Sequence, residues 1–322
     1  MSGLAALLPA AELSAVVQRD ATGELPDSVH AISKPVVAGA RRAALALAPM
    51  RNVDLVHALD VDLPVATHAA RVATVHDMSV FDAPWAYSRA RAMGERVLLR
   101  SSLHRADVLL AVSDFTAERV QALIGRECIV TPLAPAPWAG PPSADQVAAA
   151  RVKYSLPDRF VLQVGTVEPR KDVALVAQAA GELDVVCVLA GAGSTGPDAP
   201  TGALGLGYVD VADLPALYRA ATVVAYASRY EGFGLPPVEA MACGGAVVAS
   251  AVGALPQVIS DGAVLVSRHT VQSWVAALRP LLRDDAQRRE LREKAIVDAG
   301  RLSWAATAEQ TVAAYRTTGA RM

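Results

Sequence analysis

Short apolar segments alternate with longer segments of helical periodicity along most of this chain. Helical patterns of about 10–18 residues separate many of these apolar segments. Because the apolar segments lack the polar alternation of a half-exposed sheet, they indicate parallel strands that helices bury on both faces. The pattern therefore predicts an α/β protein with doubly wound parallel sheets. The predicted strands are Leu13–Gln18, Val53–His57, Val72–His76, Val108–Val112, Cys128–Thr131, Phe160–Val164, Val185–Leu189, Leu204–Val209, Thr222–Tyr226, Ala246–Ala249 and Ala263–Val266.

A proline-rich segment divides the chain. Pro132–Pro142 reads PLAPAPWAGPP and holds five prolines in eleven residues, so it cannot pair in a central strand and acts as a semi-rigid connector. We expect an N-terminal domain over residues 1–135 and a C-terminal domain over 143–302. A last helix within 303–322 is predicted to pack back on the first domain. Two such domains are expected to face a cleft, where the carboxyl ends of the strands collect ligands.

Composition excludes several classes of protein. The 322 residues carry a net charge of −2, with 53% hydrophobic and 19% charged residues, so a disordered chain and an extended nucleic-acid surface are both disfavoured. The three cysteines are odd in number and lack CxxC spacing, which argues against a disulfide or zinc framework. The uncharged stretch Ala240–Ser260 contains glycines and a proline and reads as turns around a buried strand. With no signal-peptide pattern at the N-terminus, a cytoplasmic location is expected.

The segment Tyr230–Gly244 carries the clearest candidate chemistry. It follows the predicted strand Thr222–Tyr226 and leads through a glycine-containing loop into a helix that opens with Pro236 and Pro237. Such a loop can direct backbone amides at an anion beside the positive end of the helix. The loop residues expected to bind are Gly232, Phe233, Gly234 and Leu235.

Two glutamates bracket this loop. Glu231 precedes it and Glu239 lies in the first turn of the helix. A carboxylate pair suits the vicinal hydroxyls of a sugar or ribose, which donate hydrogen bonds to charged acceptors. The alternative is that the helix dipole alone stabilises a glutamate in the first turn.

A second candidate loop lies between the predicted strand Phe160–Val164 and a helix that starts near Val173. It includes Gly165, Arg170 and Lys171. Two adjacent cations near a helix start suit a diphosphate, with Arg as a bidentate fork and Lys as a point charge. The alternative is a solvated pair of side chains.

Three further features lie in the N-terminal half. His76 follows a predicted strand, where residues that face a cleft are found, although a lone histidine there is often a structural hydrogen-bonding group. The helix Ser88–Arg105 is basic and could lie on an anionic membrane, or could simply present a solvated face. Asp60-Val61-Asp62 is a short D-x-D match of a kind common by chance, and the histidines lack zinc-type spacing. No essential metal is expected.

The run E-G-F-G-L-P-P-x-E-A-M-A-C-G resembles the E-x7-E donor-site signature of the retaining glycosyltransferase family 4, the group 1 glycosyltransferases, which have the two-domain GT-B fold. Gly253–Val258 is similar to the G-x-x-P-E-V turn of that family, with Gln257 where Glu is commoner. The resemblance implies that Glu239 holds the ribose of the nucleotide and Glu231 the donor sugar. It further implies that His76 faces that sugar from the N-terminal domain.

The resemblance also assigns the diphosphate to the loop that holds Gly165, Arg170 and Lys171. Many members place an arginine directly after the glycine, where this chain has Thr166. Arg170 and Lys171 are therefore the candidates for stabilising the leaving diphosphate. His76, Glu231, Arg170 and Lys171 are the predicted catalytic residues.

The implied activity is metal-independent transfer of a hexose, with a mannose-like sugar favoured, from a nucleotide diphosphate sugar to a hydroxyl group. The acceptor would be a glycan, a lipid-linked sugar or a small molecule, as in polysaccharide biosynthesis. No cofactor besides the donor substrate and no nucleic acid is expected. Peripheral contact with the inner face of the membrane is left open.

The N-terminal domain departs from the family pattern. Leu4–Pro9 looks like the tail of the first helix, and the first strand with its glycine loop is missing from the sequence. Either the start lies upstream, or the domain is rearranged, or the protein is a non-catalytic descendant. Two alternatives to a transferase therefore stay open, namely a weak or inactive nucleotide-binding partner subunit and a GT-B sugar epimerase. A dehydrogenase is disfavoured because no G-x-G-x-x-G opens a strand–helix unit.

Overall fold

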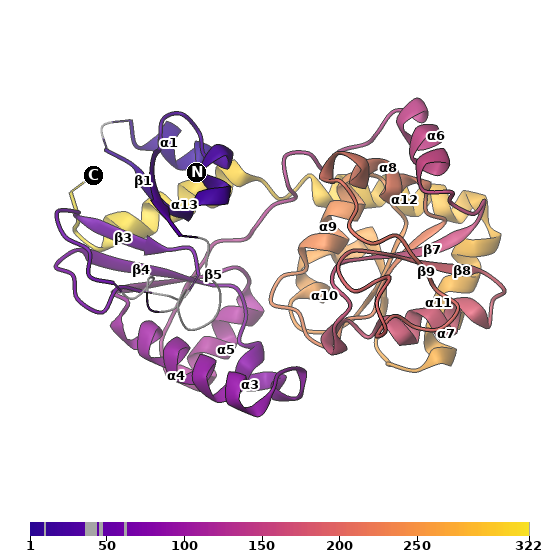
Figure 1. The fold of residues 1–322 in the computed structure, drawn as a ribbon, viewed down its shortest axis with the longest axis horizontal. Helices are drawn as coiled ribbons and strands as arrows, with labels where there is room; N and C mark the ends of the chain where they lie inside the picture. Colours follow the sequence, from indigo (N-terminus) through magenta and orange to yellow (C-terminus); the bar gives the residue numbers. More distant parts are fainter. Residues whose placement is uncertain (10, 36–43, 45–47, 61–62, 322) are drawn as a thin grey trace. The chain divides into compact units, whose positions relative to one another are not determined.

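The computed structural model describes residues 1–9, 11–35, 44, 48–60 and 63–321 of the chain. These residues form two compact units (Figure 1). Unit 1 comprises residues 1–81, 88–132 and 304–322, and unit 2 comprises residues 82–87 and 133–303. Helix α3 (Ser79–Asp82) crosses the boundary between them in the sequence.

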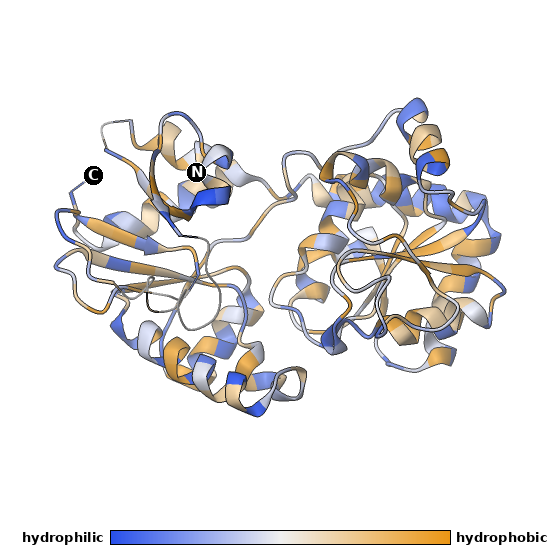
Figure 2. Cartoon of the chain, in the orientation of Figure 1, coloured by the Kyte–Doolittle hydropathy of each residue, from blue (hydrophilic) through white to orange (hydrophobic). Residues whose placement is uncertain are grey.

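Unit 2 is built on a six-stranded parallel sheet in the order β12-β11-β10-β7-β8-β9. Its strands are rich in Val, Leu and Ala and are buried along most of their length, which is why they lack polar alternation (Figure 2). The strands are β7 (Phe160–Val164), β8 (Val186–Ala190), β9 (Leu204–Gly205), β10 (Val223–Tyr226), β11 (Val247–Ser250) and β12 (Ala263–Val266).

Helices cover both faces of this sheet. Helices α7 and α11 lie on one face, where their core cluster includes the fully buried Trp274 and Leu278, and α8, α9 and α12 lie on the other (Figure 1). This is the doubly wound arrangement that the apolar strands predict. The helices are α6 (Ala144–Lys153), α7 (Val173–Gly181), α8 (Leu214–Ala220), α9 (Leu235–Ala242), α10 (Leu255–Val258), α11 (Val271–Arg283) and α12 (Asp285–Ala299).

Unit 1 holds a four-stranded parallel sheet, β3-β4-β5-β6, and a separate parallel pair, β1-β2. In the part of the chain that the structure describes, no strand precedes β1. The strands are β1 (Ser14–Gln18), β2 (His30–Lys34), β3 (Leu55–Ala58), β4 (Ala70–Val75), β5 (Val108–Ala111) and β6 (Ile129–Val130). The helices are α1 (Ser2–Leu7), α4 (Arg89–Arg105), α5 (Asp114–Ile124) and α13 (Trp304–Thr317).

Helix α13 returns from the end of the chain to unit 1. It packs against α1, and its Val312 and Tyr315 join a core cluster with Leu8 and Val72. The Tyr315 hydroxyl hydrogen-bonds Nδ1 of His57 on β3 (2.6 Å), and Nε2 of His57 bonds the Thr74 hydroxyl on β4 (2.8 Å). Burial, with a smaller effect of His76, lowers the pKa of His57 to about 4, so the ring is neutral at pH 7.

Three differences between the predicted and observed strands go beyond small shifts of their ends or bear on the candidate site. The segment Leu204–Val209 pairs only over Leu204–Gly205, because Gly207 has a φ of +69° and turns the chain away. Strand β4 ends at Val75, so His76 lies just beyond it. Strand β2 is absent from the predicted set because its sequence HAISK is polar at both ends and only partly buried.

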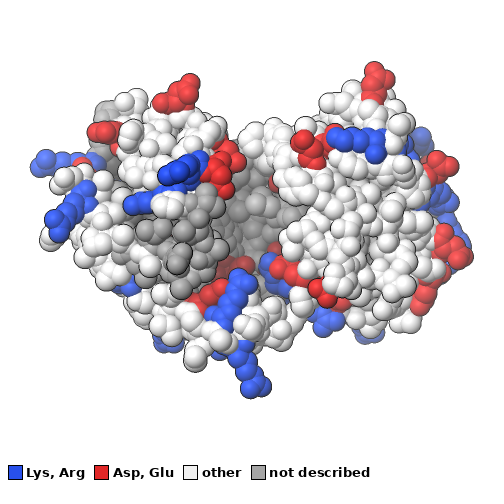
Figure 3. Space-filling view, in the orientation of Figure 1, with Lys and Arg blue, Asp and Glu red and all other residues white. Residues whose placement is uncertain are grey.

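Lysine and arginine side chains are interspersed with acidic ones on the face drawn in Figure 3. In the part of the chain that the structure describes, no helix is both long and apolar enough to cross a membrane. No group of three or more His, Cys, Asp or Glu side chains that could hold a metal ion occurs among the described residues. Of the D-x-D match, Val61 and Asp62 lie outside the described residues.

Candidate functional site

The candidate site lies where the strand order of unit 2 reverses. Strands β7 and β10 are neighbours, and the chain leaves β7 toward β8 but leaves β10 toward β11. The loops after the carboxyl ends of two such strands diverge and leave a crevice that binds ligands in open α/β sheets. These loops are residues 165–172 and 227–234, so the first is the loop of Gly165, Arg170 and Lys171 and the second holds the start of the segment Tyr230–Gly244.

A backbone hydrogen bond and a side-chain hydrogen bond join the two loops. The amide of Arg229 donates to the carbonyl of Arg170 (2.8 Å), and Nε of Arg229 donates to Oδ2 of Asp172 (2.8 Å). On the other side, the amide of Gly165 donates to the carbonyl of Ala190 at the end of β8 (2.8 Å). The functional side chains are therefore carried on fixed backbone.

Gly165 makes room for Lys171. Gly165 has a φ of +131°, and a Cβ there would overlap the Nζ of Lys171. That ammonium group also lies 6.0 Å from the ring centroid of Tyr226, within reach of a cation–π contact. Burial lowers the pKa of Lys171, while the charges of Glu231 and Glu168 act in the opposite direction.

Arg170 lies beside Glu231. Nη1 of Arg170 is 3.7 Å from Oε2 of Glu231 and donates to the carbonyl of Tyr230 (3.3 Å), and Nη2 lies 3.2 Å from Oε1 of Glu168. Glu231 is only 8% exposed and accepts a hydrogen bond from the hydroxyl of Ser228 (2.7 Å). The sheet thus brings Arg170, Lys171 and Glu231 into one cluster at the switch point.

The second loop enters α9 through Gly234. This residue has a φ of +100°, and a Cβ there would overlap the side chain of Leu255. Because glycine at the N-cap position has no side chain, no side-chain cap bonds the first amides of α9. Gly253 supports the loop from behind, since a Cβ there would overlap the Glu231 carbonyl that accepts from the amide of Ala254 (3.0 Å). Gly232 and Phe233, which complete the loop, are buried.

Glu239 lies on α9 one helical turn after Leu235, and so beyond the first turn that the sequence predicts for it. Within the described residues its carboxylate has no hydrogen-bond or ion-pair partner. Burial raises the pKa of Glu239 to about 7. A carboxylate that is half desolvated and lacks a protein partner is suited to accept hydrogen bonds from the hydroxyl groups of a ligand.

His76 belongs to unit 1 and is exposed at the carboxyl end of β4. One of its ring nitrogens, Nε2, hydrogen-bonds the carbonyl of Leu59 (2.7 Å). The role of His76 toward a donor sugar stays a prediction.

Sequence reasoning missed two residues of the cluster. Glu168 forms an ion pair with Arg170, and the hydroxyl of Ser228 donates a hydrogen bond to Glu231. The only signal for either was its place in a loop that follows a buried strand, because no residue type by itself indicates a supporting hydrogen bond.

This cluster can stabilise negative charge on a diphosphate and accept hydrogen bonds from sugar hydroxyls. Arg170 and Lys171 on one loop and Glu231 on the other supply opposite charges a short distance apart. Preorganised charges of this kind stabilise a leaving diphosphate without reorganisation.

Known proteins match both the sequence and the fold. The family described as "Glycosyl transferases group 1" matches residues 148–298. O-antigen chain mannosyltransferase B from Escherichia coli is 32% identical over 301 residues, which cover 86% of this chain and 77% of that protein. The serotype-specific mannosyltransferase WbdA from Escherichia coli is 29% identical over 247 residues, but this chain spans only 29% of its length.

Among solved structures, HepE from Anabaena in complex with UDP and glucose superimposes with a TM-score of 0.69. The match covers 90% of this chain and 86% of HepE at 19% identity, a level of identity that establishes the shared fold alone. The matched residues 148–298 lie within unit 2 and include both loops of the candidate site.

The structure has two units built on parallel sheets, with a charged cluster at the switch point of the second. A curated relative is similar over most of both chains. The chain belongs to the group 1 glycosyltransferases and has the GT-B fold of that enzyme family.

Proposed function

We propose that this chain transfers a hexose, with a mannose-like sugar favoured, from a nucleoside diphosphate donor to a hydroxyl group, with retention of the anomeric configuration. The observation that carries the proposal is the cluster of Arg170, Lys171 and Glu231 at the switch point of unit 2. The mannose-like donor and a role in polysaccharide assembly are supported by the names of the two Escherichia coli relatives. The acceptor is a glycan, a lipid-linked sugar or a small molecule.

In this proposal the two sides of the cluster have different roles. Arg170 and Lys171 stabilise the charge that develops on the leaving diphosphate, together with the amides at the start of α9. Glu239 accepts hydrogen bonds from the ribose, and Glu231 accepts them from the donor sugar. Because two side-chain cations are present for the diphosphate, we propose that neither a metal ion nor a further cofactor is required.

The test uses the full chain with GDP-mannose, UDP-glucose and other nucleotide sugars, and detects released nucleotide and the anomeric configuration of the product by NMR. We expect release with one nucleotide class, an unchanged rate in EDTA and a product of retained configuration. Glu231→Gln should lower kcat by about 10²-fold or more, since it removes the charge but preserves the shape. Nucleotide binding without any transfer across donors and acceptors would favour the inactive partner subunit. Epimerised donor would favour the sugar epimerase.

His76 is proposed to contact the donor sugar from unit 1. If so, His76→Ala lowers kcat while the Kd for the free nucleoside diphosphate stays within about twofold, because the nucleotide contacts lie on unit 2. If His76→Ala weakened the binding of the free nucleoside diphosphate as much as it lowered kcat, this assignment would be contradicted.

We also propose that unit 1 works at the cytoplasmic face of a membrane, in peripheral contact through α4. Arg89, Met93, Val97 and Arg100 are exposed and recur at helical spacing on one side of this helix. Two apolar side chains between two cations suit an anionic lipid surface. By contrast, Arg96 on the same helix donates to the carbonyl of Val80 (2.6 Å) and supports the fold.

The membrane proposal is tested by sedimentation with phosphatidylglycerol and with phosphatidylcholine vesicles. We expect binding to the anionic vesicles only, and a clear loss in Arg89→Gln/Arg100→Gln. The control is Arg279→Gln, an exposed arginine of unit 2. Absence of sedimentation with either vesicle would refute the contact.

A further inference from the structure

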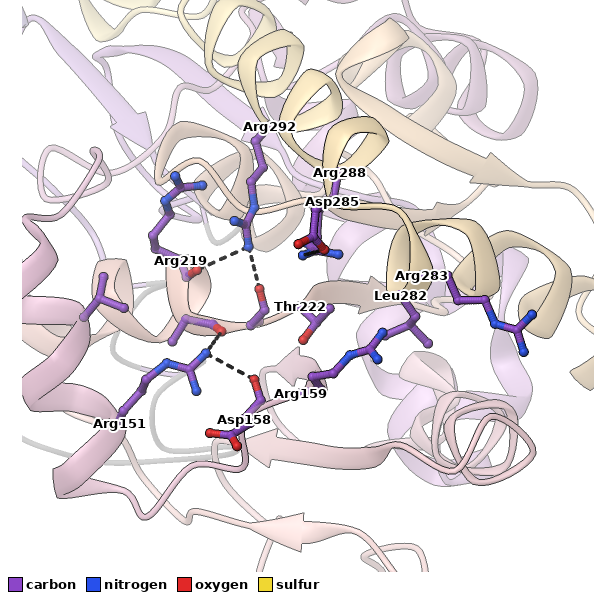
Figure 4. Close-up of a pocket in the computed structure, with 13 residues that line it drawn as sticks. Arg151, Asp158, Arg159, Arg219, Thr222, Leu282, Arg283, Asp285, Arg288 and Arg292 are labelled. Carbon is purple, nitrogen blue, oxygen red and sulfur yellow. Dashed lines mark hydrogen bonds and ion pairs between the residues drawn. The ribbon is translucent and has the colours of Figure 1, made fainter.

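Unit 2 has a cavity at the edge of its sheet opposite the candidate site. The candidate site follows the carboxyl ends of β7 and β10, whereas this cavity includes Arg159 and Thr222, which directly precede those two strands (Figure 4). Its volume is about 420 Å³, within the range of small-molecule sites. Residues of α6, α8, α11 and α12 complete its walls.

Arginine dominates this cavity. Its lining holds six arginines and two aspartates, Asp158 and Asp285, so the positive charges exceed the negative ones by four. The six arginines are Arg151, Arg159, Arg219, Arg283, Arg288 and Arg292.

Three of these arginines bond only backbone carbonyls among the described residues. Arg151 donates to the carbonyl of Ala220 (2.8 Å), Arg292 to that of Ala221 (2.7 Å), and Arg219 to that of Gly244 (3.0 Å). The bonds from Arg151 and Arg292 cover the carbonyl end of α8. A neutral carbonyl satisfies a donor but does not neutralise a guanidinium, so the positive charge stays in the cavity.

The other three arginines differ in their partners. Arg288 pairs with Asp285, one helical turn before it on α12, and also donates to the carbonyl of Leu281 (2.7 Å). Arg159 and Arg283 are exposed at the cavity and form no hydrogen bond or ion pair with any described residue. Figure 4 draws no bond from either of them to the other residues of the lining. Asp284 caps the first amides of α12 (2.8 and 3.0 Å), so an anion here would be held by arginine side chains and not by that helix end.

The clustered charges oppose one another. Burial, together with the neighbouring cations Arg219, Arg288 and Arg151, lowers the pKa of Arg292 to about 10. Its Nε is buried and has no hydrogen-bond partner among the described residues. A bound anion would relieve this repulsion and bond the arginine forks bidentately.

We propose that this cavity binds a small phosphate-bearing anion with two or more negative charges, at a site separate from the donor site. Arg159 and Arg283 are placed to contact the ligand from the mouth of the cavity, and Arg288 and Arg292 from its wall. The volume leaves room for a phosphorylated metabolite as well as for pyrophosphate. The inference rests on the cavity itself and holds whether or not the donor site is active.

The experiment is isothermal titration of the full chain with inorganic pyrophosphate, in a Lys171→Met background that weakens binding at the candidate donor site. We expect one binding event to persist and to weaken about tenfold or more in Arg159→Gln/Arg283→Gln, since each lost contact is a charged hydrogen bond. The control for the change at Arg283 is Arg279→Gln, which removes one arginine charge from α11 one turn before Arg283 and outside the cavity. It should change the Kd less than twofold.

Folding is not at risk in the test variants, because Arg159 and Arg283 bond no described residue. Unchanged pyrophosphate affinity in the double variant, or complete loss of binding in Lys171→Met alone, would overturn the proposal. Sedimentation with phosphatidylglycerol vesicles separates a soluble anion from a lipid headgroup. The double variant should sediment like the parent chain, and a selective loss of vesicle binding would overturn the assignment to a soluble ligand.

Discussion

At the scale of single residues, the ionisation of Glu239 decides how well it can accept hydrogen bonds from a nucleotide. Its pKa is raised to about 7, so the fraction ionised rises from about one tenth at pH 6 to nine tenths at pH 8. A carboxylate accepts hydroxyl hydrogen bonds more strongly than a neutral acid. The affinity for a nucleoside diphosphate should therefore increase between these pH values.

We expect the affinity to rise about tenfold from pH 6 to pH 8, that is, the Kd to fall about tenfold. The Kd is measured by titration at constant ionic strength. Glu239→Gln is the control, because it cannot ionise and retains the shape of the side chain. The titrations of the phosphate and of Lys171 remain in this variant. If the variant keeps the full pH dependence of the parent chain, Glu239 is not the group responsible.

The backbone at Gly165 is a second residue-scale determinant. In Gly165→Ala, the new Cβ overlaps the ammonium of Lys171, whose flexible end moves away, and the φ of +131° becomes strained. We expect a stability loss of about 1–3 kcal/mol and at least a tenfold weaker nucleotide Kd. The comparison is Gly181→Ala at the end of α7, where a Cβ meets nothing within 4 Å.

Gly181→Ala should leave the Kd unchanged and should not lower the melting temperature. If Gly165→Ala lowers stability but binds the nucleotide normally, Lys171 is not a ligand of the diphosphate.

At the scale of elements, the docking of α13 on unit 1 depends on a neutral histidine. His57 has a pKa of about 4 in the folded chain and about 6.5 when unfolded, so below pH 6.5 the unfolded chain binds more protons. The stability contribution is complete above pH 6.5 and is lost as the pH falls toward 4. Between pH 7 and pH 5 we expect a loss of about 2 kcal/mol from this group.

Hydrogen exchange of the α13 amides, corrected for intrinsic rates, measures this loss in unit 1. In His57→Asn the baseline stability is lower, but the pH-dependent part that comes from His57 should vanish. An identical pH dependence in both proteins would mean that protonation of His57 is not what loosens α13.

Elements also show what the sequence can and cannot predict. The family resemblance grouped Arg170, Lys171 and Glu231 in advance, and the parallel pairing of β7 with β10 carries both of their loops to one edge of the sheet. The bond between His57 and Tyr315 joins residues 258 positions apart and leaves no local pattern. The arginine cavity was missed for the same reason, because four helices contribute to it.

At the scale of the whole molecule, family membership gives the fold and the class of reaction, whereas the donor and the acceptor must be argued from the site itself. The central claim is that the loops after β7 and β10 hold the diphosphate of a sugar nucleotide. Arg170 and Lys171 are the residues on which this claim depends.

The most direct measurement is titration of the full chain with GDP, UDP, ADP and TDP, for the parent chain and for Arg170→Ala/Lys171→Met. Arg279→Ala/Lys294→Met removes the same two charges from exposed helix positions of unit 2 and serves as the control. We expect one nucleotide to be preferred, a Kd about 100-fold weaker in the loop variant, and no change in the control. Equal affinity of the folded loop variant and the parent chain would contradict the account.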